Sequence, residues 1–338
     1  MSILVTGGCG YLGSHTCLAL LEAGYDVVAL DNFSNSTRAS LVRVSELTGT
    51  PLKLYQCDVR NGMQLIGILE ENEIEAVIHF AALKNPVESF GKPLEYYENN
   101  VGGTLTLLRV MAMKGVKKLV FSSSAAVYGK TEGQPVAEET PLCPVSPYGK
   151  TKAACEEMIA AYAASDPDFS AVVLRYFNPI GAHPSGRIGE SPKQAPMNLL
   201  PRLMAAADTG APLTVTGTDF PTPDGTGQRD YLHVCDVAQG HVLALRALEE
   251  TTGVTVCNLG TGAPVSVLEL IAAFERATGA KVPYELGARR EGDAARSWAD
   301  VTRARQLLGF AAEHTLEEAC RDAWRWYCDN PEGYGEDV

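Results

Sequence analysis

Residues Ser2 to Gly13 read Ser-Ile-Leu-Val-Thr-Gly-Gly-Cys-Gly-Tyr-Leu-Gly, an apolar run followed by glycines at positions 7, 8, 10 and 13. The run 3–6 predicts a buried strand, and the residues after Gly10 predict a helix. Glycines at such a junction permit a tight turn and a close approach of the backbone to a pyrophosphate, which the helix N-terminus attracts. The stretch therefore predicts a dinucleotide-binding strand–turn–helix unit.

Asp31 follows the next apolar run, residues 26–30, and supports this interpretation. A carboxylate at the end of the second strand hydrogen-bonds a ribose 2′-hydroxyl and repels a 2′-phosphate, so we expect NAD rather than NADP. The alternative is a glycine-rich turn with an incidental surface aspartate, which the strand–turn–helix context disfavours.

The first half of the chain alternates apolar runs with helix-like segments. Strands are predicted at 3–6, 26–30, 52–55, 76–80, 118–122 and 171–175, and crossover helices at 11–23, 63–71, 93–114 and 146–164. The runs are continuously apolar rather than alternating, which indicates a parallel sheet buried on both faces. The predicted fold class is α/β, with a doubly wound, mostly parallel Rossmann-type sheet.

The pattern changes after about residue 178. Residues 179–227 are rich in proline and glycine, and later segments predict helices at 236–249, 267–278 and 316–328 and a strand at 255–258. We expect an NAD-binding domain at 1–177 and a smaller α+β substrate-binding lobe at 178–338. Residues of about 230–262 are expected to return and pack on the first domain.

Composition and charge exclude several classes of protein. The 338 residues are 46% apolar and 20% charged, which rules out a largely disordered chain. A formal net charge of −13 opposes binding to nucleic acid or to an anionic membrane. Nine cysteines without a Cys-x-x-Cys pair indicate reduced thiols, and the early glycines interrupt any signal peptide or membrane span, so we expect a cytoplasmic protein.

The segment Ser146-Pro-Tyr148-Gly-Lys-Thr-Lys152 is a second candidate for chemistry. Ser146 suits a helix N-cap and Pro147 the first helical position, which places Tyr148 and Lys152 one turn apart on one face. A tyrosine acts as a base near neutrality only if its pKa falls from about 10 to about 7, and a neighbouring ammonium and a positive nicotinamide ring favour that change. The spacing alone is compatible with chance, so this interpretation depends on the dinucleotide motif.

Ser122-Ser-Ser124 ends the predicted strand 118–122. In a doubly wound sheet ligands bind at the carboxyl ends of the strands, so a hydroxyl here can reach the reacting centre. The alternative is a run of small residues where the backbone turns.

Together, the glycine pattern, the strand-end serine and Tyr-x-x-x-Lys resemble the extended short-chain dehydrogenase/reductase family. Longer strings resemble its UDP-glucose (UDP-galactose) 4-epimerase group over essentially the whole chain. They are Leu4-Val-Thr-Gly-Gly8, Lys92-Pro-Leu-Glu-Tyr-Tyr-Glu-Asn-Asn100, Phe121-Ser-Ser-Ser-Ala125, Arg175-Tyr-Phe-Asn-Pro179, Gly225-Thr-Gly-Gln-Arg-Asp-Tyr231 and Arg289-Arg-Glu-Gly-Asp293.

The resemblance implies a 4-epimerase that interconverts UDP-glucose and UDP-galactose through a transient 4-keto sugar, in galactose or nucleotide-sugar metabolism. NAD is tightly bound and regenerated in each turnover. Tyr148 would remove the proton from the sugar 4-hydroxyl, Ser124 would hydrogen-bond the 4-oxygen, and Lys152 would lower the pKa of the tyrosine and hold the nicotinamide ribose. Members of the family are commonly homodimers, which we expect here too.

The resemblance also implies two sets of binding residues. Those for the cofactor are Gly7, Gly10, Tyr11, Leu12, Gly13, Asp31, Asn32, Phe33, Ser34, Asn35, Ser36, Asp58, Val59, Phe80, Ala81, Ala82, Lys84, Asn99, Ser122, Tyr148, Lys152 and Phe177. Those for the UDP-sugar are Ser124, Tyr148, Asn178, Asn198, Leu199, Thr214, Val215, Thr216, Arg229, Arg290, Asp293 and Ser297. A diphosphate bound by so acidic a protein needs a local cationic clamp, which the planar fork of arginine suits. Without the resemblance, Arg229 and Arg290 read as solvated side chains and Asp58 as a helix cap.

Two positions depart from the resemblance. Thr216 stands where the family often has an aromatic residue beside the uracil, which leaves the packing of the nucleotide open. Ser297 stands where many members carry tyrosine, whose ring narrows the pocket around the sugar 2-position. Because serine removes that ring, we hypothesise that UDP-N-acetylglucosamine and UDP-N-acetylgalactosamine are also accepted.

Other functions remain as alternatives. A UDP-sugar 4,6-dehydratase or a nucleotide-sugar reductase shares the fold, but such dehydratases place an acidic pair where Ala125-Ala126 follows Ser124 here. A non-catalytic NAD sensor or scaffold is another alternative. It would not need an aligned base, so the presence of Ser124, Tyr148 and Lys152 argues against it. The six histidines show no metal-ligand spacing and Gly-x-Ser-x-Gly is absent, so we expect neither a metal nor hydrolase chemistry.

Overall fold

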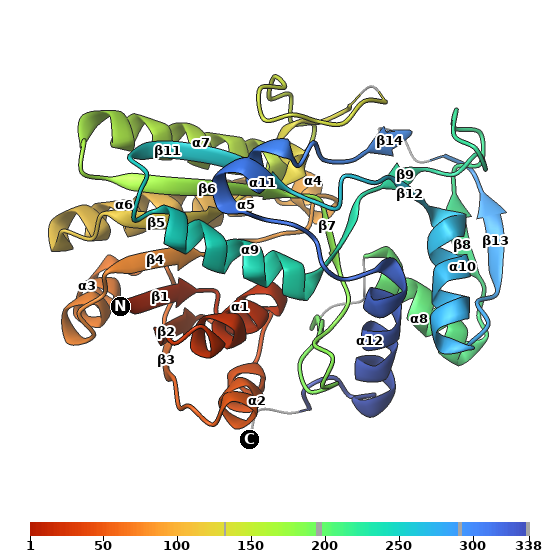
Figure 1. The fold of residues 1–338 in the computed structure, drawn as a ribbon, viewed down its shortest axis with the longest axis horizontal. Helices are drawn as coiled ribbons and strands as arrows, with labels where there is room; N and C mark the ends of the chain where they lie inside the picture. Colours follow the sequence, from red (N-terminus) through yellow and green to blue (C-terminus); the bar gives the residue numbers. More distant parts are fainter. Residues whose placement is uncertain (132, 194–197, 290–292, 336–338) are drawn as a thin grey trace.

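A seven-stranded sheet runs through the molecule, shown in Figure 1 as a computed structural model that describes residues 1–131, 133–193, 198–289 and 293–335. The strands stand in the order β11-β6-β5-β4-β1-β2-β3, and each neighbouring pair is parallel. Their bounds are β1 Ser2–Thr6, β2 Asp26–Asp31, β3 Lys53–Gln56, β4 Ala76–His79, β5 Lys118–Ser122, β6 Ser170–Tyr176 and β11 Gly253–Leu259. The predicted doubly wound parallel sheet is confirmed, and the six strands predicted in the first half are present with ends shifted by at most one residue.

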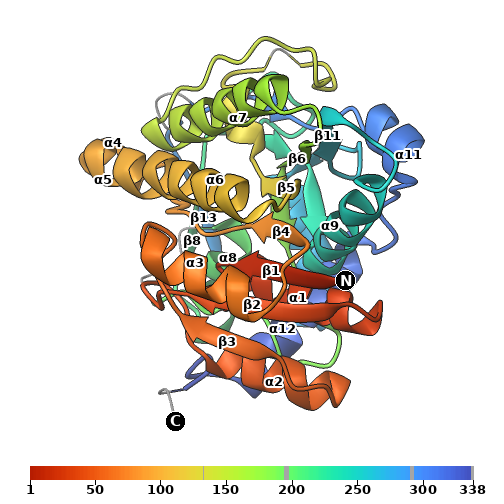
Figure 2. The same ribbon diagram turned by 90° about the vertical axis from the view of Figure 1, so that its left-hand side faces the viewer.

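Helices cover both faces of this sheet, which explains why its central strands are mostly apolar. All residues of β4 and β6 are buried. One face carries α1 (Tyr11–Glu22), α2 (Ala39–Thr48) and α9 (Val234–Ala247), and the other carries α3 (Gly62–Glu71), α6 (Gly103–Lys114) and α7 (Pro147–Ser165), as Figure 2 shows. A buried apolar cluster lies on each side of the sheet.

The predicted helix over 93–114 is helical throughout but not uniform. Its parts are α5 (Pro93–Tyr96), the π-helical turn η1 (Tyr97–Gly102) and α6, and the short α4 (Glu88–Gly91) precedes them. The start of α7 is as predicted, since the N–H of Gly149 donates to Oγ of Ser146 at 3.1 Å and Pro147 occupies the first turn. The short 3₁₀-helix η2 (Ala125–Val127) follows β5.

A second lobe lies beside the carboxyl ends of the sheet strands (Figure 1). Its helices are α8 (Leu199–Thr209), α10 (Val267–Thr278) and α12 (Leu316–Asp329), around a buried apolar cluster. Its strands form small sheets: β7 (Asn178–Ile180) with β10 (Tyr231–His233), β8 (Leu213–Thr216) with β13 (Tyr284–Gly287), and β9 (Gln228–Arg229) between β12 (Val265–Ser266) and β14 (Arg296–Ser297). The sequence did not predict α8 or β8, because Pro201 and the glycines around both elements hide their periodicity.

The chain crosses between the two parts more than once. After β10, α9 packs on α1 and β11 pairs in parallel with β6 over seven residues, and the short α11 (Thr302–Leu308) contacts α9. Strands of the seven-stranded sheet and strands of the second lobe therefore alternate along the chain. The division into domains at residue 177 stays a prediction.

Candidate active site

The glycine-rich turn between β1 and α1 packs so closely against other backbone atoms that Gly7 and Gly13 leave no room for a side chain. Gly7 has a φ of +70°, and a Cβ on Gly13 would lie 2.2 Å from the backbone oxygen of Gly7. No side chain caps the N-terminus of α1, so its first N–H groups can meet phosphate oxygens. This cradle fits the pyrophosphate of a dinucleotide.

Asp31 closes the same turn from the end of β2. Its carboxylate accepts hydrogen bonds from the N–H of Cys9 at 3.0 Å, the N–H of Phe33 at 2.9 Å and Oγ of Ser36 at 2.7 Å. An ionised carboxylate has about four lone-pair positions, so one acceptor position is left for a ribose hydroxyl. Asp31, the expected partner of the ribose, is therefore held against the glycine-rich turn.

A cavity begins at this turn and continues along the carboxyl ends of the sheet strands. Most residues predicted to bind the cofactor line it: Gly7, Gly10, Tyr11, Leu12, Gly13, Asp31, Asn32, Ser34, Asn35, Ser36, Val59, Phe80, Ala81, Ala82, Lys84, Asn99, Ser122, Tyr148 and Lys152. The segments that follow β1 and β4, the ends of β2 and β5, and α7 therefore meet at one edge of the sheet, where open α/β sheets bind ligands.

Three predicted cofactor residues do not line the cavity. Phe177 is buried against Val127 and Tyr128, and Phe33 contributes its N–H to Asp31. Asp58 forms an ion pair of 2.8 Å with Arg60, whose hydrogen bonds hold the pKa of the carboxyl well below its usual range. Asp58 also accepts from Asn32 Nδ2 at 3.0 Å, which ties it to a loop that does line the cavity.

Tyr148 and Lys152 line the cavity, and Ser124 lies beside Tyr148 without lining it. Tyr148 and Lys152 are buried, and the Ser124 hydroxyl is close enough to the Tyr148 phenol to act on its pKa. Nζ of Lys152 donates to the backbone oxygen of Ser122 at 2.6 Å. The strand-end serines and the α7 pair, distant in sequence, thus form one polar group at the cavity wall.

Burial dominates the protonation of this group. It raises the pKa of Tyr148, against the effect of the Ser124 hydroxyl, and it lowers the pKa of Lys152 to about 8, against the nearby Cys155 and Glu156. Burial therefore keeps the pKa of the Tyr148 phenol above its ordinary value in the protein alone, and the ammonium of Lys152 is engaged by the Ser122 carbonyl.

The residues predicted for the UDP-sugar are spread over several elements of the second lobe. Nη2 of Arg229 on β9 pairs with Oδ1 of Asp293 at 2.5 Å, and Arg229 lies opposite Ser297 in the ladder between β9 and β14. Asn178 begins β7, Leu199 begins α8, and Thr214, Val215 and Thr216 lie on β8. Asn198 caps α8 and lines a small cavity with Leu200. Arg290 lies outside the described residues.

Comparisons with known proteins place this site in a family. Residues 3–260 match the NAD dependent epimerase/dehydratase family. The chain belongs to this family. UDP-glucose 4-epimerase of Bacillus subtilis is 50% identical over 335 residues, which cover 99% of each chain.

Two solved structures resemble this epimerase-family chain over 98% of its length at 46% identity. One is UDP-glucose 4-epimerase from Stenotrophomonas maltophila with bound NAD and formylated UDP-arabinopyranose, matched over 99% of that chain with a TM-score of 0.96. The other is the Bifidobacterium longum enzyme with NAD⁺ and UDP, matched over 100% of that chain with a TM-score of 0.94. The predicted family, its NAD dependence and the prediction of a UDP-glucose 4-epimerase are confirmed by these matches.

Sequence reasoning missed part of the cavity wall of this epimerase-family chain. The additional lining residues are Cys9, Leu30, Thr37, Cys57, Leu83, Tyr176, Gly189, Glu190, Ser191, Pro192 and Tyr334. Several, such as Leu30 and Tyr176, directly precede or follow a predicted residue, and that proximity along the chain could have indicated them. Residues 189–192 and Tyr334 carry no local signal, since only tertiary packing brings them to the site.

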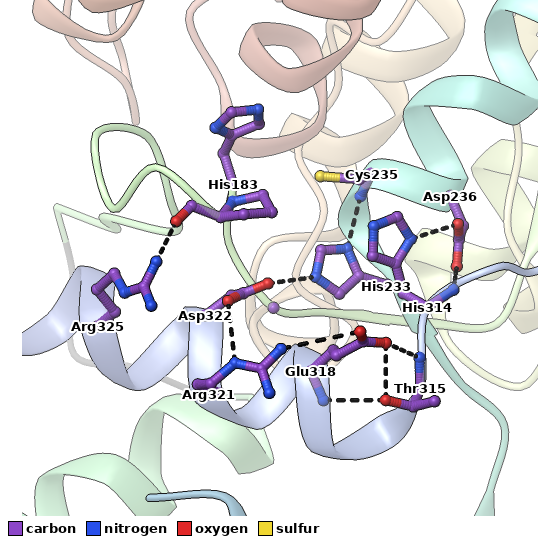
Figure 3. A network of polar contacts seen from close by, with 12 residues as sticks. His183, His233, Cys235, Asp236, His314, Thr315, Glu318, Arg321, Asp322 and Arg325 are labelled. Atoms are coloured by element: carbon purple, nitrogen blue, oxygen red, sulfur yellow. Dashed lines mark hydrogen bonds and ion pairs between the residues drawn. The ribbon is translucent and has the colours of Figure 1, made fainter.

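Three histidines gather where α12 meets β10 and α9 (Figure 3). The rings of His233 and His314 stack with centroids 4.2 Å apart; Nδ1 of His314 lies 2.7 Å from Asp236 Oδ1, and Nε2 of His233 lies 3.5 Å from Asp322 Oδ2. With His183 close by, these contacts connect α12 of the second lobe to α9, which packs on the seven-stranded sheet. Within the described residues, no three His, Cys, Asp or Glu side chains form a group able to hold a metal ion, and no helix is long and apolar enough to cross a membrane.

Proposed function

We propose that the chain interconverts UDP-glucose and UDP-galactose by oxidation and re-reduction at the sugar C4. The observation that carries this proposal is that Tyr148 and Lys152, with Ser124 beside the tyrosine, meet at the wall of the cavity that the glycine-rich turn opens. NAD⁺, when bound, supplies a hydride acceptor that returns the same hydride in each turnover. Its pyrophosphate would be held by the turn at Gly7 to Gly13 and its ribose by Asp31.

Each side chain of the group has a distinct task in this reaction. Tyr148 takes the proton of the 4-hydroxyl as C4 loses its hydride, which leaves a 4-keto sugar, and it returns the proton when C4 is reduced on the opposite face. Ser124 donates a hydrogen bond to the 4-oxygen. Lys152, fixed to the Ser122 carbonyl one helical turn from the phenol, would hold the nicotinamide ribose, and the positive charge of bound NAD⁺ would favour the phenol anion.

We propose that the second lobe binds the UDP portion through the residues named from the resemblance. Arg229 is the described cation best placed to neutralise the diphosphate, and its pairing with Asp293 fixes the guanidinium beside β14. Thr216 would contact the uracil through a methyl and a hydroxyl group instead of a ring. The domain division at residue 177 belongs to the same proposal.

Incubation with UDP-galactose, without added cofactor, tests the reaction. We expect UDP-glucose to accumulate without net NADH, because the hydride removed is returned to the same sugar. A 4-keto-6-deoxy product would instead indicate a 4,6-dehydratase. No conversion by folded protein that retains NAD would favour a sensor.

We also propose that UDP-N-acetylglucosamine and its galacto epimer are substrates. Ser297 is half-buried on β14, next to the Arg229–Asp293 pair, and its small side chain leaves space for a 2-acetamido group. Ser297→Tyr should lose turnover of the N-acetyl substrates at least tenfold while retaining that of UDP-galactose. Absence of turnover by the unaltered chain, or equal turnover by Ser297→Tyr, contradicts the proposal.

A cytoplasmic homodimer is the assembly we propose. All nine cysteines are free, which suits a reducing compartment. Val87, Phe90, Leu94 and Tyr97 lie between the residue before α4 and the first residue of η1, and they are 61%, 61%, 82% and 41% exposed. Such exposed apolar residues suit the self-complementary face of a two-fold dimer. Sedimentation should give twice the chain mass and Leu94→Glu a monomer; a monomeric parent contradicts the dimer.

A further inference from the structure

Glu156 is a buried carboxylate to which the proposed reaction gives no task. It lies on α7 four residues after Lys152 and eight after Tyr148, so the three side chains share one face of the helix. Glu156 is 7% exposed, and its partner Arg175 on β6 is 5% exposed. Nε of Arg175 donates to the two carboxylate oxygens at 3.0 and 3.1 Å, and Nη2 donates to Oε2 as well.

A buried ion pair of this kind contributes little net stability. Taking two charges out of water costs about as much free energy as their attraction returns, and apolar replacements of similar volume are often as stable. What the pair holds in place is therefore more informative than its own strength. Its contacts lead to both ends of the segment that carries the strand-end serines.

At the first end, Oγ of Ser123 donates to Oε1 of Glu156. Ser123 stands between the two serines of the site: the carbonyl of Ser122 accepts from Lys152 Nζ at 2.6 Å, and the Ser124 hydroxyl acts on the pKa of Tyr148. A shift of the Ser123 backbone would therefore displace a partner of each member of the α7 pair.

At the second end, Arg175 fixes the residue that follows η2. Ser124 is the N-cap of η2, and Tyr128 comes directly after its last residue. Nη1 of Arg175 donates to the hydroxyl of Tyr128 at 2.9 Å, and that hydroxyl donates to Oδ1 of Asn258 on β11 at 2.7 Å. The Glu156–Arg175 pair thus clamps η2 before and after its single turn.

We propose that Glu156 is a positioning residue, which, paired with Arg175, fixes the turn from Ser122 to Tyr128 and so aims Ser124 at Tyr148 and the Ser122 carbonyl at Lys152. A second effect is electrostatic. Burial lowers the pKa of Lys152, whereas the Glu156 carboxylate acts in the opposite direction and preserves the ammonium. This inference rests on the proposed epimerase reaction.

Two variants test it by different routes. Ser123→Ala removes the hydroxyl without touching a buried charge, and kcat for UDP-galactose should fall about tenfold with little change in KM. Glu156→Gln leaves Arg175 without its counter-charge one turn from Lys152. Its kcat should fall at least tenfold, and the alkaline limb of the kcat–pH profile should move to lower pH by about one unit.

The control is Glu157→Gln, which alters the exposed neighbour on the same helix and should match the parent chain. If Glu156→Gln does not fold, Ser123→Ala alone decides, since it keeps the ion pair. Folded variants with the parent's NAD content, kcat and pH profile would overturn the positioning role. A parent chain that fails to convert UDP-galactose would overturn the proposed function instead.

Discussion

Tyr148 is the side chain whose removal should separate chemistry from binding. Tyr148→Phe keeps the ring that packs in the buried site and removes only the proton acceptor. We expect kcat to fall by about 10²- to 10⁴-fold, the usual contribution of a general base, with unchanged NAD content. Turnover of UDP-galactose and the cofactor released on denaturation measure the two effects. Undiminished turnover would mean that another group is the base.

For single residues, the sequence predicted best those positions that depend only on nearby positions in the chain. Tyr148 and Lys152 share a helical face by spacing alone, and Asp31 follows its strand directly. Arg175 stands inside one of the quoted strings, yet its contact with Glu156 crosses from β6 to α7 and depends on how the helix packs. Glu190 reaches the cavity from an irregular segment, so neither periodicity nor motif could indicate it.

The first turn of α1 is an element whose function depends on the absence of one side chain. In Gly13→Ala the new Cβ would meet the Gly7 backbone oxygen at 2.2 Å, and a backbone atom cannot turn away as a side chain can. We therefore expect loss of bound NAD and of activity, measured by cofactor content and turnover. Retention of both would contradict the geometry of the turn.

Helix α3 offers the matched control. Gly67 lies within Gly62–Glu71, and a Cβ there would meet no atom within 4 Å. Gly67→Ala should raise the free energy of unfolding by up to about 1 kcal/mol, because alanine loses less backbone entropy in a helix, and should leave activity unchanged. Thermal denaturation checks this result. A destabilised Gly67→Ala would show that space around α3 is tighter than the structure indicates.

Helices and strands with a clear hydrophobic pattern or a capping residue were predicted from the sequence, and those without either feature were not. The capping serine fixed the start of α7, and continuous apolar runs fixed the sheet strands. The π-helical turn η1 has no sequence pattern that distinguishes it from α-helix, so 93–114 was predicted as one helix. β8 is four residues long and pairs with β13, about seventy positions away, so its stability is tertiary rather than local.

The whole molecule should lose stability on mild acidification, because it buries three neutral histidines. Burial lowers the pKa of His15 and His79 to about 3 and that of His241 to about 4, whereas the unfolded chain has histidine pKa values of about 6.5. Below pH 6.5 the histidines therefore bind protons in the unfolded state but not in the folded state, so falling pH favours unfolding. Each histidine contributes about 1.4 kcal/mol per pH unit, or about 4 kcal/mol per unit for the three between about pH 6 and 4.5.

Urea unfolding at half-unit steps of pH across this range measures that slope. Carboxylates with lowered pKa values, such as Asp58, begin to add their loss of stability below about pH 5, so the part of the range above pH 5 isolates the histidines. His241→Leu should reduce the slope by about a third, since the ring is wholly buried between Phe80 and Tyr176 and has no exposed edge to protonate. A free energy of unfolding that stays constant from pH 6.5 to 4.5 would show that these histidines are protonated in the folded chain.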